Sequence, residues 1–146
     1  MESLPLLSRV ILYGVFSIMG LFVVLVFCWQ IGILRGRELK NPDGSVDSWK
    51  QQDTHYGIAI ADILIACPVN AIGIALALAG SRWGFYMVAL VSFWWVWANV
   101  MTTATSLRFH KPRLTPMWFI VFPLGVVIGV TYIAWTIVYF DVIYAL

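Results

Sequence analysis

Charged residues are scarce in this chain of 146 residues, because Asp, Glu, Lys and Arg together make up only 11% of it. A soluble domain carries about a quarter of its residues as charged side chains. Hydrophobic residues make up 62% of the sequence, and its mean hydropathy is +0.89. A soluble chain of this length could not bury so much apolar surface. We therefore expect lipid to be the solvent for much of the chain.

Cysteine and histidine are also rare, with two of each. Cys28 and Cys67 fall inside apolar stretches and outside any CxxC pattern, which predicts small buried hydrophobes and no disulfide framework. A haem inside a helical bundle needs axial ligands from the bundle interior, whereas His55 and His110 lie at the ends of apolar stretches. The sequence therefore identifies no cofactor, no metal site and no catalytic residue. A net charge of +2 gives no argument for nucleic acid as a partner.

Four stretches are long and apolar enough for membrane helices, each of which needs about 20 mostly apolar residues. They cover residues 10–34, 56–79, 84–107 and 117–140. The connections at 80–83 and 110–116 are short, which makes successive helices antiparallel neighbours. The main extramembrane loop is expected at residues 35–55. We therefore predict an all-α fold for residues 1–146, a single domain that is an integral membrane four-helix bundle of antiparallel up-down topology.

Basic residues are distributed unevenly between the two sides of this bundle. Seven of the nine Lys and Arg residues lie in the connections at 35–55 and 108–116. Arg9 and Arg82 lie on the opposite side, together with both termini. Positively charged loops remain in the cytoplasm, so we expect both connections to be cytoplasmic and both termini to be outside. The general outline is that of small bacterial four-helix proteins of the cytoplasmic membrane, which is the expected location.

Polar side chains inside the predicted spans need an explanation, because an unpaired amide or carboxyl in hydrocarbon costs several kcal/mol. The candidates are Gln30, Asp62, Asn70, Asn99, Thr102 and Thr103. In the second span, Asp62, Ala66 and Asn70 follow at spacings of four and predict one buried face, which Gly73 and Ala77 continue. In the third span, a stripe at helical spacing joins Ser92, Trp95, Asn99, Thr103 and Ser106.

Counting residues from the basic ends of the spans places Asp62 level with Thr102, and Asn99 one turn deeper. Because the second and third spans are neighbours, we expect Asp62 to lie against Asn99, Thr102 or Thr103. The result would be a polar pocket in the half of the bundle nearer the basic loops, with Gln30 close to it. The expected residues of its rim are His55, Tyr56, Arg108 and His110.

Glycine and proline mark two further features of the spans. Gly125 and Gly129 form a GxxxG pattern, for which internal helix packing is favoured over a dimer interface. Pro68 and Pro123 can bend their helices and free backbone carbonyls near the polar layer.

The polar pocket has three interpretations. It can bind an amphiphile with an anionic end, such as a lipid headgroup or a quinone-like ring. It can carry a proton on Asp62. It can also be a hydrogen-bonded clamp that only stabilises helix packing.

Short loops and the lack of a nucleophile–base pair favour a non-catalytic subunit or accessory protein of a membrane assembly. The alternatives are binding or transport of an amphiphilic ligand or a proton around Asp62 and Asn99, and then an intramembrane enzyme acting on a lipid. Expected partners are bilayer lipids, other membrane subunits or further copies of this chain, and an amphiphilic small molecule.

The orientation can be tested with single cysteines introduced at the termini. In intact cells, a cysteine at either terminus should react with a membrane-impermeant thiol reagent, because both termini are expected outside. Matched cysteines within 35–55 or 108–116 should react only after the membrane is permeabilised. Termini that are protected in intact cells would contradict the predicted orientation.

Overall fold

The computed structural model describes residues 4–38, 40, 44–46, 48–108 and 116–144, and nearly all of them are helical. The elements are α1 (Leu6–Leu34), α2 (Trp49–Ala61), the π-helical segment η1 (Asp62–Ala66), α3 (Cys67–Leu78), α4 (Arg82–Ser106), α5 (Pro116–Val138) and α6 (Phe140–Tyr144). One isolated antiparallel bridge pairs Lys40 with Val46 in the connection after α1. The predicted all-helical fold is confirmed for this part of the chain.

Within the described residues, four helices are long and apolar enough to cross a membrane, and they cover Leu6–Leu34, His55–Leu78, Arg82–Ser106 and Ile120–Val138. These four helices confirm the four apolar spans expected at 10–34, 56–79, 84–107 and 117–140. The second span is continuous through α2, η1 and α3, because η1 only widens one turn of the helix.

Several helix ends differ from the predicted ones, and the largest difference is at the start of the second span. Helix α2 begins at Trp49, within the segment that was expected as the main loop. Its first turns are polar, and a helix continues through them because its backbone hydrogen bonds are internal, as in the bond of 3.0 Å from the Gln52 N–H to the Ser48 carbonyl. The last span ends at Val138, and the short helix α6 follows it.

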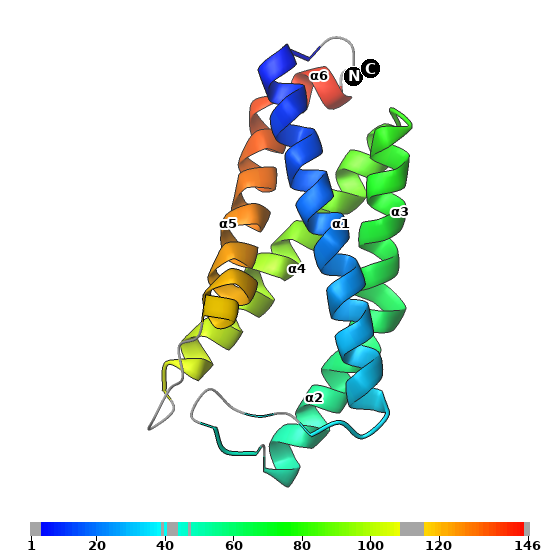
Figure 1. Cartoon of the computed structure of the whole chain (residues 1–146). Coiled ribbons are helices and arrows are strands. Elements are labelled where there is room, and N and C mark those ends of the chain that lie inside the picture. Colours follow the sequence, from blue (N-terminus) through cyan, green and yellow to red (C-terminus); the bar gives the residue numbers. More distant parts are fainter. Residues whose placement is uncertain (1–3, 39, 41–43, 47, 109–115, 145–146) are drawn as a thin grey trace.

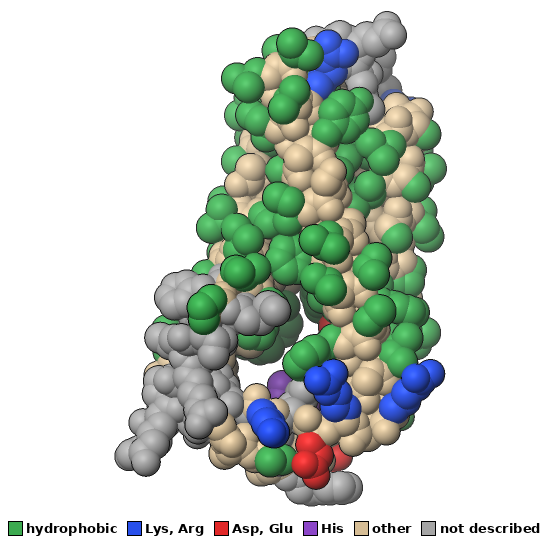
Figure 2. Space-filling model, in the orientation of Figure 1, with side chains coloured by type: hydrophobic (Ala, Val, Ile, Leu, Met, Phe, Trp, Pro, Cys, Tyr) green, Lys and Arg blue, Asp and Glu red, His purple; other side chains and the backbone are tan. Residues whose placement is uncertain are grey.

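The long helices lie roughly side by side, and both termini are at the same end of the bundle (Figure 1). Helix α4 packs against α3 near that end and then runs away from it toward α5. Figure 2 shows hydrophobic side chains over most of the visible face, basic side chains mainly at the lower end, and a hollow in the lower half of the molecule. The bundle is therefore tight at the end with the termini and open toward the end with the basic connections.

The turn between α3 and α4 brings these two helices into close contact. Gly80 has a φ of 80°, a left-handed conformation that ends α3. Just beyond it, Gly84 lies so close to α3 that a Cβ at this position would collide with the backbone of Leu76 and Ala77. At Gly73, one turn lower on α3, an added Cβ would lie 2.9 Å from a methyl of Val88. The close contact between α3 and α4 therefore depends on glycine, which has no side chain, at positions 73 and 84.

An aromatic core fills the end of the bundle near the termini. The Tyr132 hydroxyl donates to the Phe85 carbonyl at 3.0 Å, and the Trp135 indole donates to the Ser8 hydroxyl at 2.8 Å. Phe16 packs on Phe85 and Tyr132, with ring centroids 6.5 and 5.8 Å apart. These contacts join α1, α4 and α5, and they satisfy the polar atoms that the aromatic rings bring inside.

Replacing Gly84 with Ala should destabilise the bundle, because the new methyl can be accommodated only if the backbones of α3 and α4 move apart. Overpacking of this kind costs about 1–3 kcal/mol. The measurement is thermal unfolding in detergent micelles, followed by circular dichroism. Gly14→Ala is the control, because an added Cβ there meets nothing within 4 Å, so this variant should unfold at the wild-type temperature or above. Equal unfolding temperatures for Gly84→Ala and the wild type would contradict the close contact.

Candidate functional site

A buried carboxyl and a buried amide pair across two helices in the open half of the bundle. Asp62 of η1 is 2% exposed, and Gln30 of α1 is 8% exposed. The Gln30 side-chain nitrogen donates a hydrogen bond to one Asp62 carboxyl oxygen. The other Asp62 oxygen and the Gln30 amide oxygen are buried and have no partner among the described residues. The pair is therefore only half satisfied by protein groups, and each member retains one free acceptor.

The backbone around Asp62 is a π-turn, which covers Asp62–Ala66. The Cys67 N–H bonds to the Asp62 carbonyl, five residues back. The next residue, Pro68, has no N–H, and its ring would clash with the carbonyl of Leu64 in a regular α-helix. Widening the turn relieves that clash. Turns of this kind occur frequently at functional sites, and the sequence indicated this one only through Pro68.

The face of η1 and α3 that carries Asp62 is buried along its length. Asp62, Ala66, Asn70, Gly73 and Ala77 are all buried, which confirms the face expected from their spacing. Asn70 is 0% exposed, and neither atom of its amide group has a hydrogen-bond partner in the described part of the chain. Because a buried polar group without a partner costs about 1–3 kcal/mol, this amide needs an explanation.

The stripe of residues at helical spacing in the third predicted span lies on α4 and also faces the interior of the bundle. Its hydrogen bonds differ from that of the Gln30–Asp62 pair, because they are made within one helix. The Asn99 side-chain nitrogen donates to the Trp95 carbonyl at 2.8 Å, and the Thr102 hydroxyl donates to the Ala98 carbonyl at 2.9 Å. Asn99 also lies against Gly125 of α5, where an added Cβ would be 2.6 Å from the amide nitrogen. Gly125 therefore serves packing between α4 and α5, as its GxxxG pattern predicted.

The expected contact of Asp62 with Asn99, Thr102 or Thr103 is not among the hydrogen bonds of the described residues. Asp62 accepts its hydrogen bond from Gln30, and the Thr103 hydroxyl is buried without a partner in the described part of the chain. The reason is tertiary: η1 packs against α1, whereas α4 runs toward α5 at this level (Figure 1). Asp62 and the polar residues of α4 lie at equal depth along neighbouring helices, but this does not bring them into contact. The reason is that α4 diverges from α3 below the turn that joins them.

A small cavity lies on the basic side of the pair. Its volume is about 70 Å³, and its lining residues are Ile33, Gly36, Arg37, Gln52, His55 and Tyr56. His55 and Tyr56 were expected as rim residues, and both line this cavity. Arg108 is exposed at the end of α4, and His110 lies outside the described residues. Because His55 precedes Asp62 by seven residues on one face, the cavity lies about two turns from the carboxyl.

Sequence reasoning did not identify Arg37 and Gln52 as cavity residues. Gly36 has a φ of 84°, and it turns the chain back so that the Arg37 N–H bonds to the Gly32 carbonyl at 3.0 Å. The Arg37 guanidinium lies over the Trp29 ring, 4.9 Å from its centroid. A glycine directly after an apolar span is a signal for such a helix end, and it could have placed Arg37 near Gln30.

The size of the cavity decides what it can hold. A site for a drug-sized ligand has a volume of about 300–1,000 Å³, and a water molecule takes about 30 Å³ of liquid. A cavity of about 70 Å³ therefore has room for a few waters and none for a quinone ring. Its cation, amide, imidazole and phenol groups supply the polar partners that such waters need.

Comparisons with protein-family models, with characterised proteins and with solved structures give no significant match. The chemistry of the site is therefore argued from these residues alone.

The contribution of the Gln30–Asp62 pair can be measured with a double-mutant cycle. Gln30→Leu should destabilise the bundle by about 1–3 kcal/mol, because it leaves the buried carboxyl without its donor. Gln30→Leu combined with Asp62→Leu should cost less than the sum of the two single changes, because no polar group is then left unpaired. The measurement is equilibrium unfolding in micelles. Ser17→Ala is the control, since this exposed hydroxyl bonds only within its own helix, and it should change stability by less than about 0.5 kcal/mol. Additive effects at Gln30 and Asp62 would show that the pair does not stabilise the packing of α1 on η1.

Proposed function

We propose that this chain crosses a bilayer four times as an antiparallel bundle, with both termini outside, and that Asp62 binds and releases a proton taken from the cytoplasmic side. The observation that carries the proposal is the buried Gln30–Asp62 pair, in which one carboxyl oxygen has no partner among the described residues. A carboxyl group inside a membrane span is expensive, and such groups mark proton or ion pathways more often than they serve packing alone.

The identity of the partner supports proton exchange. An Arg or Lys beside Asp62 would hold the carboxylate in its charged form. Gln30 is neutral, and its amide has both a donor and an acceptor. It can donate to the carboxylate through its nitrogen, as it does here, and it can accept from the protonated acid through its oxygen. Both protonation states of Asp62 therefore have a hydrogen-bonding partner, which lets the group change state without unfolding its surroundings.

The route to Asp62 is supported by the cavity at the basic end of the bundle. His55 and Tyr56 line it, and His55 shares a helix face with Ala59 and Asp62. Ala59 is small, so it takes little of the space between the cavity and the carboxyl. Water in the cavity would deliver the proton to Asp62.

Asn70 continues the same face toward the middle of the span. It lies eight residues beyond Asp62, a rise of about 12 Å. Both of its amide atoms are buried without a partner in the part of the chain that the structure describes, which is the arrangement that an internal water would satisfy. This position favours Asn70 as the next polar group along a path inward from Asp62.

The second candidate is the non-catalytic subunit or accessory protein that the sequence favours. The supporting observation is the hollow in the lower half of the molecule, on the side to which α4 departs from α3 (Figure 2). A membrane subunit would cover this hollow and would purify together with the chain. The role is compatible with proton binding at Asp62, because a proton site can serve a larger assembly.

Asp62→Asn should abolish the protonation of one buried carboxyl. The measurement is infrared difference spectroscopy of the protein in lipid vesicles during a pH titration, in which a carboxylic acid gives a band that shifts in heavy water. The wild type should show the band of a carboxyl shielded from water, and Asp62→Asn should lack it. Asp53→Asn is the matched control, because Asp53 is an exposed acid on α2, and this variant should retain the band. A wild-type spectrum from Asp62→Asn would refute the proposed proton site.

A further inference from the structure

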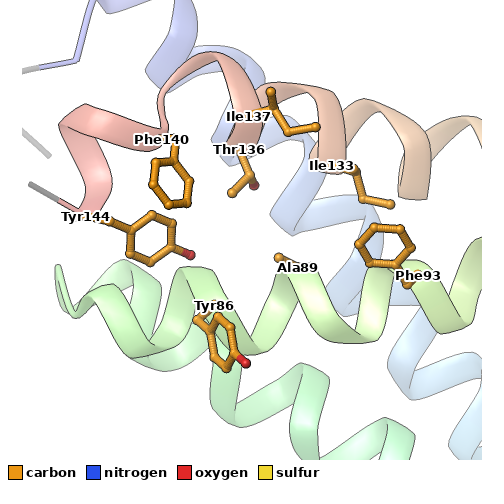
Figure 3. Close-up of a pocket in the computed structure, with 8 residues that line it drawn as sticks. All are labelled: Tyr86, Ala89, Phe93, Ile133, Thr136, Ile137, Phe140 and Tyr144. Atoms are coloured by element: carbon orange, nitrogen blue, oxygen red, sulfur yellow. The ribbon is translucent and has the colours of Figure 1, made fainter.

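A second, larger cavity lies at the opposite end of the bundle, between α4 and the α5–α6 segment. Its volume is about 400 Å³, which is within the range of small-molecule sites. It is lined by Tyr86, Ala89 and Phe93 of α4, by Ile133, Thr136 and Ile137 of α5, and by Phe140 and Tyr144 of α6 (Figure 3). It shares no residue with the small cavity below Asp62.

This groove opens on the outer face of the bundle. Phe93 is 63% exposed, and Ile137 is 70% exposed, although both line it. In the proposed bilayer these side chains face hydrocarbon, so a ligand would enter the groove from the lipid phase. Its rims are bulky, and among the residues of α4 that line it only Ala89 is small. A partner helix has a diameter of about 10 Å and needs small residues to approach closely, whereas a thin flexible chain does not.

A hydrogen-bond donor is present at one end of the groove. In Figure 3 the Tyr144 side chain extends from α6, and its hydroxyl points toward the space between α4 and α5. Burial, with a smaller contribution from the neighbouring Tyr86, raises the pKa of Tyr144 above its ordinary value. The phenol therefore stays protonated and can donate to an acceptor such as an ester carbonyl.

A positive charge lies one turn beyond that end. Arg82, Tyr86, Ala89 and Phe93 follow at spacings of four, three and four, so they share one stripe of α4. Arg82 begins α4 and is exposed. The neighbouring Trp83 packs edge-on against Tyr86, with 6.3 Å between the ring centroids. Exposed Trp and Arg side chains at the end of an apolar helix are typical of the membrane interface, where lipid phosphates lie.

The geometry points to a binding site for an anionic glycerophospholipid. Its acyl chain lies in the groove over Ala89, an ester carbonyl accepts from the Tyr144 hydroxyl, and its phosphate pairs with Arg82. Arg82 precedes Ala89 along α4, and in Figure 3 the Tyr144 side chain of α6 lies on the Tyr86 side of Ala89, which matches the order of charge, ester and hydrocarbon in the lipid. The inference requires the bilayer location proposed above, but it does not require the proton site at Asp62.

The test uses the full chain in detergent micelles with phosphatidylglycerol and phosphatidylcholine of identical acyl chains. Native mass spectrometry should show that the wild type retains phosphatidylglycerol in preference to phosphatidylcholine. Arg82→Gln should lower that preference about fivefold, since one basic residue near a lipid phosphate contributes about 1 kcal/mol. Tyr144→Phe should lower the retention of both lipids, because the ester carbonyl loses its donor. Equal retention of the two lipids by the wild type would overturn the anionic specificity.

A second pair of variants locates the acyl chain. Ala89→Phe should fill the groove and abolish retention of both lipids. The matched control is Leu90→Phe, which adds an aromatic ring at the next residue, outside the groove lining and 52% exposed. Phosphatidylglycerol with a photoreactive group in its acyl chain should crosslink to α4 and α5 in Leu90→Phe and in the wild type. If Ala89→Phe is folded by circular dichroism and still crosslinks there, the groove is not the lipid site. If Ala89→Phe does not fold, the crosslinked positions in the wild type decide, and positions away from α4, α5 and α6 overturn the inference.

Discussion

Apolar surroundings offer no hydrogen-bond partner, and this constraint accounts for the local structure of the four helices that are apolar enough to cross a membrane. Backbone groups in such a solvent must pair within their own segment, which favours helices. Several short polar side chains follow the same rule, whereas Asn70 and Thr103 do not. The hydroxyls of Ser17, Ser92, Thr131 and Thr136 and the amide of Asn99 each donate to the carbonyl four residues back on the same helix. These groups need no second helix to be satisfied.

Asp62 cannot follow that rule, because a carboxylate has no hydrogen to donate to a carbonyl of its own helix. Its partner must come from another element, and Gln30 of α1 supplies it. The Gln30–Asp62 pair is therefore a tertiary contact that the chemistry of the carboxyl requires. The same argument makes it a candidate site, since one donor cannot satisfy both carboxyl oxygens.

Pro68 links the local backbone geometry to the position of the candidate site. Its missing N–H and its ring are accommodated by the π-turn over Asp62–Ala66, which is the segment that carries the carboxyl. A wider turn displaces the residues before it relative to those after it. The proline in α3 thus helps to determine where Asp62 lies relative to α1, although it contacts neither the proton nor the cavity in our proposal.

The two cavities differ in volume, and this difference assigns the proton and the amphiphile to separate sites. The cavity near Asp62 holds about 70 Å³ and has polar groups, which suits water and protons. The groove near the termini holds about 400 Å³ between apolar walls, which suits a hydrocarbon chain. From the sequence alone, an amphiphile and a proton share one predicted pocket, because both need polar groups at a membrane interface. The two proposed sites lie at opposite ends of the bundle and can be tested independently.

The sequence by itself determined the four apolar helices, the buried face of Asp62, Ala66 and Asn70, and the inward stripe on α4. Length, apolarity and helical spacing are local properties, and the requirement for internal hydrogen bonds turns them into helices whatever the rest of the chain does. Only the tertiary structure decided which faces meet. Asp62 pairs with Gln30 instead of Asn99 because Gly73 and Gly84 bring α3 and α4 together at one end, and α4 then runs toward α5. The angle at which helices cross depends on packing between distant segments, and the periodicity within a single span does not predict it.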